Sequence, residues 1–103
     1  MPPLLTLTGQ SNKDYVFTAL PLNQKLPSSA GVYVVTNAIS NDEGQVHHTP
    51  LQIESCSDLS KLSDESAIQN LRTEGATMIC VKIEEVMEKR QQIERELKAK
   101  YLA

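Results

Sequence analysis

The sequence predicts an α+β domain with a small, mostly antiparallel sheet of three to four strands flanked by helices. Three observations support this fold class. Runs rich in β-branched, aromatic and aliphatic residues occur at 15–20, 32–36, 51–54 and 78–83. The chain ends in a long stretch with helical periodicity. Turn-forming residues separate the strand-like runs, as antiparallel pairing requires.

The chain has 103 residues, which fits one domain rather than two. Residues 1–13 are weakly patterned and end in a turn-rich stretch, so we expect an N-terminal arm followed by a single domain over 14–103. Neither a signal peptide nor an apolar run of about 20 residues, the length that a membrane helix needs, is visible. The sequence therefore predicts a cytoplasmic protein with no membrane partner.

Charge and cysteine content argue against two function classes. Ten basic residues against thirteen acidic ones give a net charge of −3, whereas strong non-specific nucleic-acid binding depends on clustered Lys and Arg. Nucleic acid is therefore not the favoured partner. Cys56 and Cys80 lack the spacing of a zinc site, which predicts free thiols in a reducing compartment. We expect no cofactor.

The strand-like runs predict a hairpin at the centre of the sheet. The run 15–20 stops at Pro21 and is expected at an edge, because proline cannot donate to a strand ladder. The run 32–36 is apolar on both faces, which is typical of a central strand. Residues 41–44 have the chemistry of a hairpin tip, so the run 51–54 should pair antiparallel with the central strand.

Helices are predicted at 58–73 and 84–101. Ser57 or Asp58 can cap the first of them, and Gly75 ends this helical region before the last strand.

The C-terminal helix carries an apolar stripe that includes Ile93 and Leu97, and Arg90 falls inside the same stripe. Arg90 is expected to pair with Glu94, one turn further along. The predicted core residues are Val34, Ile79, Val81, Ile93 and Leu97.

Two motifs near the ends of the domain suggest a family. Gly31-Val32-Tyr33 begins the central strand, and Glu94 lies some sixty residues downstream in the run 93–101. Between them stand a hairpin, a helical region and a further strand. In this order and spacing, roughly residues 14–102 resemble the small single-domain branch of the GIY-YIG nuclease superfamily.

The resemblance implies roles for two residues and draws attention to two basic ones. Tyr33 would help to activate the nucleophile, and Glu94 would hold a divalent cation, for which Mg²⁺ suits a carboxylate ligand. Arg90 lies in the matching stretch of the last helix. Lys61 is the basic residue next to the position where the family carries its catalytic arginine. We predict a vestigial site made of these four residues.

Two departures from the family pattern bear directly on catalysis. Gln52-Ile53-Glu54 stands where the second motif is expected, so that an aromatic hydroxyl and a glycine are missing. Leu62 stands where the family has its arginine. A neutral side chain cannot stabilise charge on a phosphate, a loss of about 3 kcal/mol in the transition state.

These departures favour a catalytically degenerate GIY-YIG-like domain that acts as a binding or interaction module, with a protein partner or self-association. One alternative is a Mg²⁺-dependent endonuclease acting on DNA, in which Lys61 or Arg72 replaces the missing arginine. A second alternative is a small structural homodimer. The adjacent His47 and His48 are interpreted as a solvated shoulder of the hairpin rather than as metal ligands.

Overall fold

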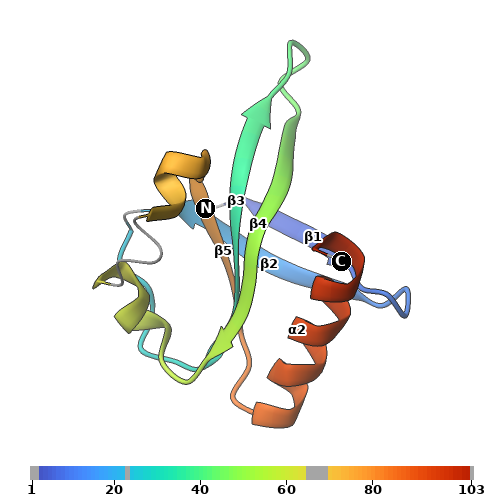
Figure 1. Ribbon diagram of the computed structural model, residues 1–103, viewed down its shortest axis with the longest axis vertical. Coiled ribbons are helices and arrows are strands. Elements are labelled where there is room, and N and C mark those ends of the chain that lie inside the picture. Colours follow the sequence, from blue (N-terminus) through green and yellow to red (C-terminus); the bar gives the residue numbers. More distant parts are fainter. Residues whose placement is uncertain (1–2, 23, 65–69, 103) are drawn as a thin grey trace.

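The computed structural model describes residues 3–22, 24–64 and 70–102. Its framework is a five-stranded antiparallel sheet with the strand order β1-β2-β5-β3-β4 (Figure 1). The strands are β1 (Leu4–Thr8), β2 (Asp14–Pro21), β3 (Gly31–Ser40), β4 (Val46–Cys56) and β5 (Met78–Ile83).

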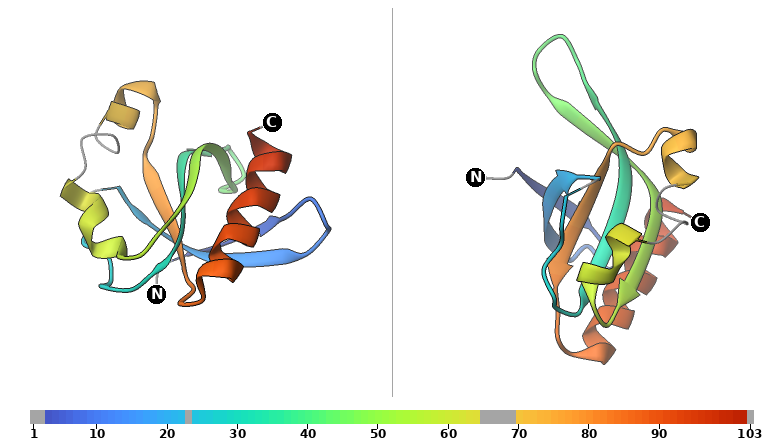
Figure 2. Two further views of the ribbon diagram at one scale, coloured as in Figure 1. Left: turned by 60° about the horizontal axis from the view of Figure 1, so that its bottom comes forward. Right: turned by 90° about the vertical axis from the view of Figure 1, so that its left-hand side faces the viewer.

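The two faces of the sheet are covered by different elements (Figure 2). The helix α2 (Met87–Tyr101) lies on one face. The 3-10 helices η1 (Leu59–Asp64) and η2 (Arg72–Glu74) lie on the other side of the molecule, and η1 packs on the second face of the sheet. None of the described helices is long and apolar enough to cross a membrane.

The α+β class and the antiparallel pairing are confirmed, but the predicted details of the architecture need correction. The sheet has five strands rather than three to four. The described residues contain one long α-helix, whereas two flanking helices were expected. Over 58–73 the structure shows 3-10 helices at both ends, and residues 65–69 lie outside the described residues. Gly75 ends this region in the left-handed conformation, with φ of 99°, as predicted.

The strand that sequence analysis missed is β1. Residues 9–13 turn the chain back, with the Gly9 N–H donating to the Lys13 carbonyl at 2.8 Å and Asn12 at a φ of 68°. The side chain of asparagine tolerates this left-handed conformation better than most. Because β1 pairs along one side of β2 and β5 along the other, β2 is an interior strand and not the predicted edge.

The centre of the sheet is β3, as expected from its apolar sequence, and the side chains of residues 32–36 are buried. A glycine is required at position 31 because the main chain of β5 lies very close to it. A Cβ atom there would lie 2.4 Å from the Lys82 carbonyl oxygen. The glycine of the Gly31-Val32-Tyr33 motif thus has a packing role in this chain.

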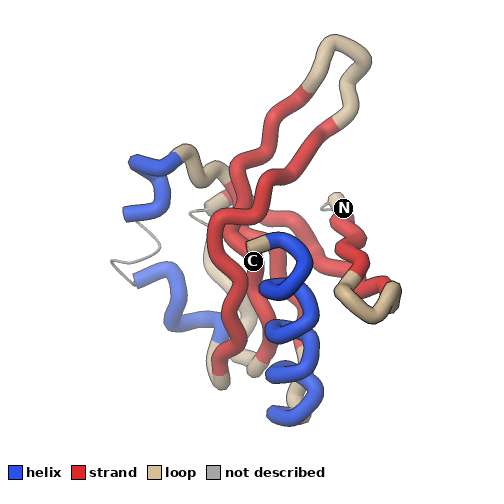
Figure 3. Tube along the Cα trace, turned by 45° about the vertical axis from the view of Figure 1, so that its right-hand side comes forward, coloured by secondary structure: helices blue, strands red, loops and turns tan. Residues whose placement is uncertain are grey.

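Beyond the first residue of β5, Met78, which pairs with Thr36, β3 and β4 continue as a two-stranded arm (Figure 3). Its tip is the turn at 41–44, where Gly44 donates to the Asn41 carbonyl at 3.1 Å, which confirms the predicted hairpin. Thr77 fixes the base of the arm, since its hydroxyl accepts the Ala38 N–H and its own N–H donates to Thr36.

Two apolar clusters form the core, one on each face of the sheet. All five core residues predicted from the sequence are buried. The cluster under α2 is made of Leu7, Tyr15, Phe17, Ala19, Val32, Val34, Ile53, Cys80, Ile93 and Leu97. The cluster on the η1 face is made of Leu20, Leu22, Leu26, Tyr33, Val35, Leu59, Leu62, Ala76, Ile79 and Val81.

Candidate functional site

The four residues predicted to form a vestigial site lie on two sides of the sheet. Tyr33 belongs to the cluster on the η1 face, and Lys61 is an exposed residue of η1 itself. Arg90 and Glu94 lie on α2, which covers the opposite face. The fold therefore divides the residues into two pairs.

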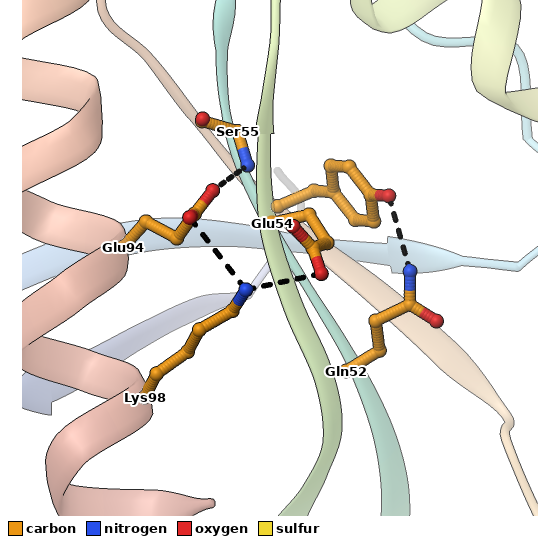
Figure 4. Close-up of polar contacts among 6 residues, drawn as sticks. Gln52, Glu54, Ser55, Glu94 and Lys98 are labelled. Carbon is orange, nitrogen blue, oxygen red and sulfur yellow. Dashed lines mark hydrogen bonds and ion pairs between the residues drawn. The ribbon is translucent and has the colours of Figure 1, made fainter.

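The Glu94 carboxylate contacts the edge strand β4. Its Oε1 accepts the main-chain N–H of Ser55 at 2.7 Å, and its Oε2 lies 3.6 Å from the Lys98 Nζ. Lys98 in turn donates to the Glu54 Oε1 at 3.1 Å. Figure 4 shows Glu94 and Lys98 reaching the strand from α2, with Gln52 on its other side. Both carboxylate oxygens of Glu94 therefore have partners within the chain.

The two carboxylates of Glu54 and Glu94 keep Lys98 in its charged form, which favours its ion pairs with both of them. Partial burial alone would lower the pKa of Lys98, but the hydrogen bond and negative charge of Glu54, together with Glu94, outweigh it and raise the pKa. Lys98 therefore stays charged and bridges the two carboxylates. Without this cation, two glutamates next to each other at a sheet edge would repel.

Arg90 does not form the ion pair with Glu94 that their spacing predicts. Its Nη1 donates to the main-chain carbonyl oxygens of Glu84 at 3.0 Å and Glu85 at 2.9 Å. These carbonyls belong to the short connection between β5 and α2. The guanidinium therefore fixes the entry into the helix.

Tyr33 and Leu62 both point into the core. Tyr33 is 5% exposed, and its hydroxyl accepts a hydrogen bond from the Gln52 Nε2 at 3.3 Å. Leu62 is 3% exposed and packs in the same apolar cluster. Lys61, the neighbour of Leu62, and Arg72 of η2 are exposed. The position at which the sequence resemblance predicted a missing arginine thus serves packing in this chain.

A polar contact that sequence analysis missed joins α2 to the β1–β2 turn. The Glu96 carboxylate accepts hydrogen bonds from the Tyr15 hydroxyl and from the hydroxyl and N–H of Ser11. These hydrogen bonds lower the pKa of Glu96. Burial, with Glu96 as a second cause, raises the pKa of Tyr15 to about 12. Ser11 and Tyr15 lie more than eighty residues from Glu96 in the sequence, so the spacing of these residues could not indicate the contact.

The two histidines at the base of the arm differ. His47 is exposed, whereas the His48 Nδ1 lies 2.9 Å from the Thr36 hydroxyl oxygen. Partial burial, and then the neighbouring His47, lower the pKa of His48. Cys80 is buried on the same side of the sheet, and burial raises its pKa to about 11. Cys56 and Cys80 are not joined in a disulfide, which agrees with the prediction that both are thiols.

Several hollows open on the surface of the described residues, among them one of about 350 Å³ beside η2 that is lined by Pro21, Leu22, Arg72, Ala76 and Thr77. Two others lie on opposite faces of the sheet. One, of about 340 Å³, lies on the sheet face opposite α2 and is lined mainly by Val16, Thr18, Leu20, Val81 and Ile83.

The other hollow, of about 270 Å³, lies beside α2 and is lined by three lysines, Lys13, Lys82 and Lys89, together with Glu84. The Glu84 carboxylate accepts the Val86 N–H at 3.3 Å. Neither hollow contains any of the four residues predicted from the family resemblance.

Among the residues that the structure describes, no group of three or more His, Cys, Asp or Glu side chains is placed to hold a metal ion. Comparison of the chain with models of protein families, with curated proteins and with solved structures finds no match.

Proposed function

We propose that this protein is a catalytically degenerate GIY-YIG-like domain that works as an interaction module. The observation that supports the proposal most strongly is that the Glu94 carboxylate binds groups of this chain. A metal-binding carboxylate must offer free oxygen lone pairs to the cation. In this chain the oxygens of Glu94 accept a main-chain N–H of β4 and pair with Lys98, so the side chain serves to attach α2 to the sheet.

The surroundings of Leu62 support the same proposal. Leu62 is buried on the opposite side of the sheet from Glu94, in a cluster with Leu59 and Tyr33. An arginine there would have to leave the core or be buried without a partner, which is costly. Leu62 is therefore a core residue, and the neighbouring exposed Lys61 is separated from Glu94 by the sheet.

An interaction role also needs a surface, and the sheet supplies one at β1. Leu4 is 69% exposed, and Val16 and Ile83 on the same face are about half exposed. No element of the described chain pairs along the outer side of β1. An open strand edge beside exposed apolar side chains is a surface on which another protein can add a strand.

The test of the proposal is a nuclease assay on the whole chain. We expect no cleavage of supercoiled plasmid or single-stranded DNA in Mg²⁺ or Mn²⁺. The same protein should lose stability when Glu94 is replaced by Ala, because the carboxylate holds the Ser55 N–H.

The alternative, a metal-dependent endonuclease, makes the opposite prediction. Metal-dependent cleavage that persists through repeated purification and disappears in Glu94→Ala would overturn the proposal. Gln91→Ala is the matched control, since Gln91 is exposed on the same helix. It should change neither cleavage nor stability by a measurable amount.

A further inference from the structure

We infer that β1 is the docking strand for a second copy of this chain, whose own β1 adds antiparallel to the first. This inference rests on the proposed function, because it names the partner of the interaction module.

The main-chain groups that face outward from β1 follow from its pairing with β2. The Pro3 carbonyl accepts the Ala19 N–H at 2.9 Å, and the Gly9 N–H donates to Lys13 at the other end of the strand. Since successive residues of a strand point their hydrogen-bonding groups to opposite sides, the odd-numbered residues of β1 bond to β2. The N–H and C=O groups of Leu4, Thr6 and Thr8 therefore point away from the sheet.

The outer side of β1 carries none of the usual protection of an edge strand. Its sequence is Leu4-Leu5-Thr6-Leu7-Thr8, without a charged residue or a proline. Its register with β2 is continuous from end to end, so that no bulge interrupts it. Natural edge strands are normally protected from pairing by such devices, and an edge without them favours strand addition.

The strand is complementary to itself. A two-fold axis at Thr6, perpendicular to the sheet, places Leu4 opposite Thr8 of the second copy and Leu5 opposite its Leu7. In this register every outward N–H and C=O of the three even-numbered residues finds a partner. Leu5 and Leu7 lie on the α2 side, so this arrangement joins the two apolar clusters under α2 across the axis.

The neutral side chains of β1 allow a second copy to dock there in spite of the net charge of the chain. Each chain has a net charge of −3, so two copies repel unless they meet at a neutral surface. β1 is such a surface, because it contains only Leu and Thr, and like charges do not face one another across the axis. At the other edge, β4 carries Glu54 paired with Lys98.

The size of the contact sets the strength of the dimer. A stable protein interface buries about 800 Å² on each partner, and strands of five residues bury clearly less. We therefore expect a weak, rapidly exchanging dimer with a Kd between about 10 µM and about 1 mM.

The test is sedimentation equilibrium of the whole chain from about 10 µM to about 1 mM, a range that brackets this Kd. The average mass should rise from 11.4 kDa toward twice that value. Thr6→Lys puts two like charges at the axis and should keep the monomer mass throughout. Thr49→Lys adds the same charge to an exposed position of β4 and should dimerise like the native chain.

Thr6→Pro provides a second test of dimerisation, in a variant that we expect to fold like the native chain. The Thr6 N–H points outward, so that proline removes a donor to the partner without breaking a bond to β2. It should also stay monomeric, with the melting temperature and circular dichroism of the native chain at low concentration.

A native chain that keeps the monomer mass at the highest concentration would overturn the inference, as would equal dimerisation of Thr6→Lys and Thr49→Lys. Either result leaves the proposed interaction module standing with a strand of another protein as the occupant. Metal-dependent DNA cleavage by the same samples, by contrast, would overturn the proposed function whatever the mass.

Discussion

The two edge strands of the sheet, β1 and β4, differ in their contacts with the rest of the chain. At β4, the carboxylate of Glu94 accepts the Ser55 N–H, and Lys98 bridges Glu94 to Glu54. At β1, the outward main-chain groups have no partner element among the described residues, and the side chains are neutral. The C-terminal helix binds one edge at Glu54 and Ser55, whereas no described element covers the other edge.

This difference between the two edges indicates which edge of the sheet is available for an interaction with another protein. The resemblance inferred from the sequence would give Glu94 the role of a metal ligand. Here the same carboxylate closes the edge of the sheet. We propose that the interaction surface lies instead at the opposite edge, on a strand that precedes the region of resemblance.

The largest expected effect comes from loosening the helix that closes β4. Leu97 is fully buried between α2 and the sheet. Leu97→Ala should lower the free energy of unfolding by about 2–5 kcal/mol, measured by urea denaturation, because it leaves a cavity in the core. Leu102→Ala, at an exposed position just after the helix, is the control. If Leu97→Ala costs no more than this control, α2 does not pack as described.

A smaller effect is expected from the polar contact itself. Glu94→Ala leaves the half-buried Ser55 N–H without its acceptor and should lower the free energy of unfolding by about 1–2 kcal/mol. A double-mutant cycle with Lys98→Met should show that the two residues are coupled, since their side chains form an ion pair. Additive effects of the two substitutions would contradict a joint role in closing the edge.

The attachment of the β1–β2 turn to α2 predicts a pH dependence. Hydrogen bonds from Ser11 and Tyr15 lower the pKa of Glu96 in the folded chain. Its contribution to stability is therefore complete above its ordinary pKa, near 4.5, and is lost as the pH falls through the lower folded value. Glu96→Gln should flatten the decline of the melting temperature in acid. Glu88→Gln, at an exposed position of the same helix, should leave the decline unchanged.

The elements that sequence analysis predicted correctly have local causes. The buried strand β3 follows from an apolar run, the hairpin tip from Asn41 and Gly44, and the inner face of α2 from the spacing of Ile93 and Leu97. Each of these signals lies within a few residues of the chain. They were enough to predict the fold class and the core.

The features that escaped prediction depend on distant partners. β1 has only five residues, and the alternation of Leu and Thr over residues 5–8 is too short to identify a strand without its pairing with β2. The spacing of Arg90 and Glu94 indicated an ion pair between them. Each group instead binds main-chain atoms, of the β5–α2 connection and of β4, because the fold brings those atoms within hydrogen-bonding distance.

The most direct test of the contrast between the two edges is amide hydrogen exchange, followed by NMR at about 20 µM and about 1 mM protein, concentrations on either side of the expected Kd. The Ser55 N–H should be protected at both concentrations, because Glu94 accepts it within one chain. The Thr6 N–H should exchange freely in the dilute sample and slow down in the concentrated one. Fast exchange of the Ser55 N–H would contradict its hydrogen bond to Glu94 at the β4 edge. Exchange of the Thr6 N–H at a rate that does not change with concentration would contradict self-pairing of β1.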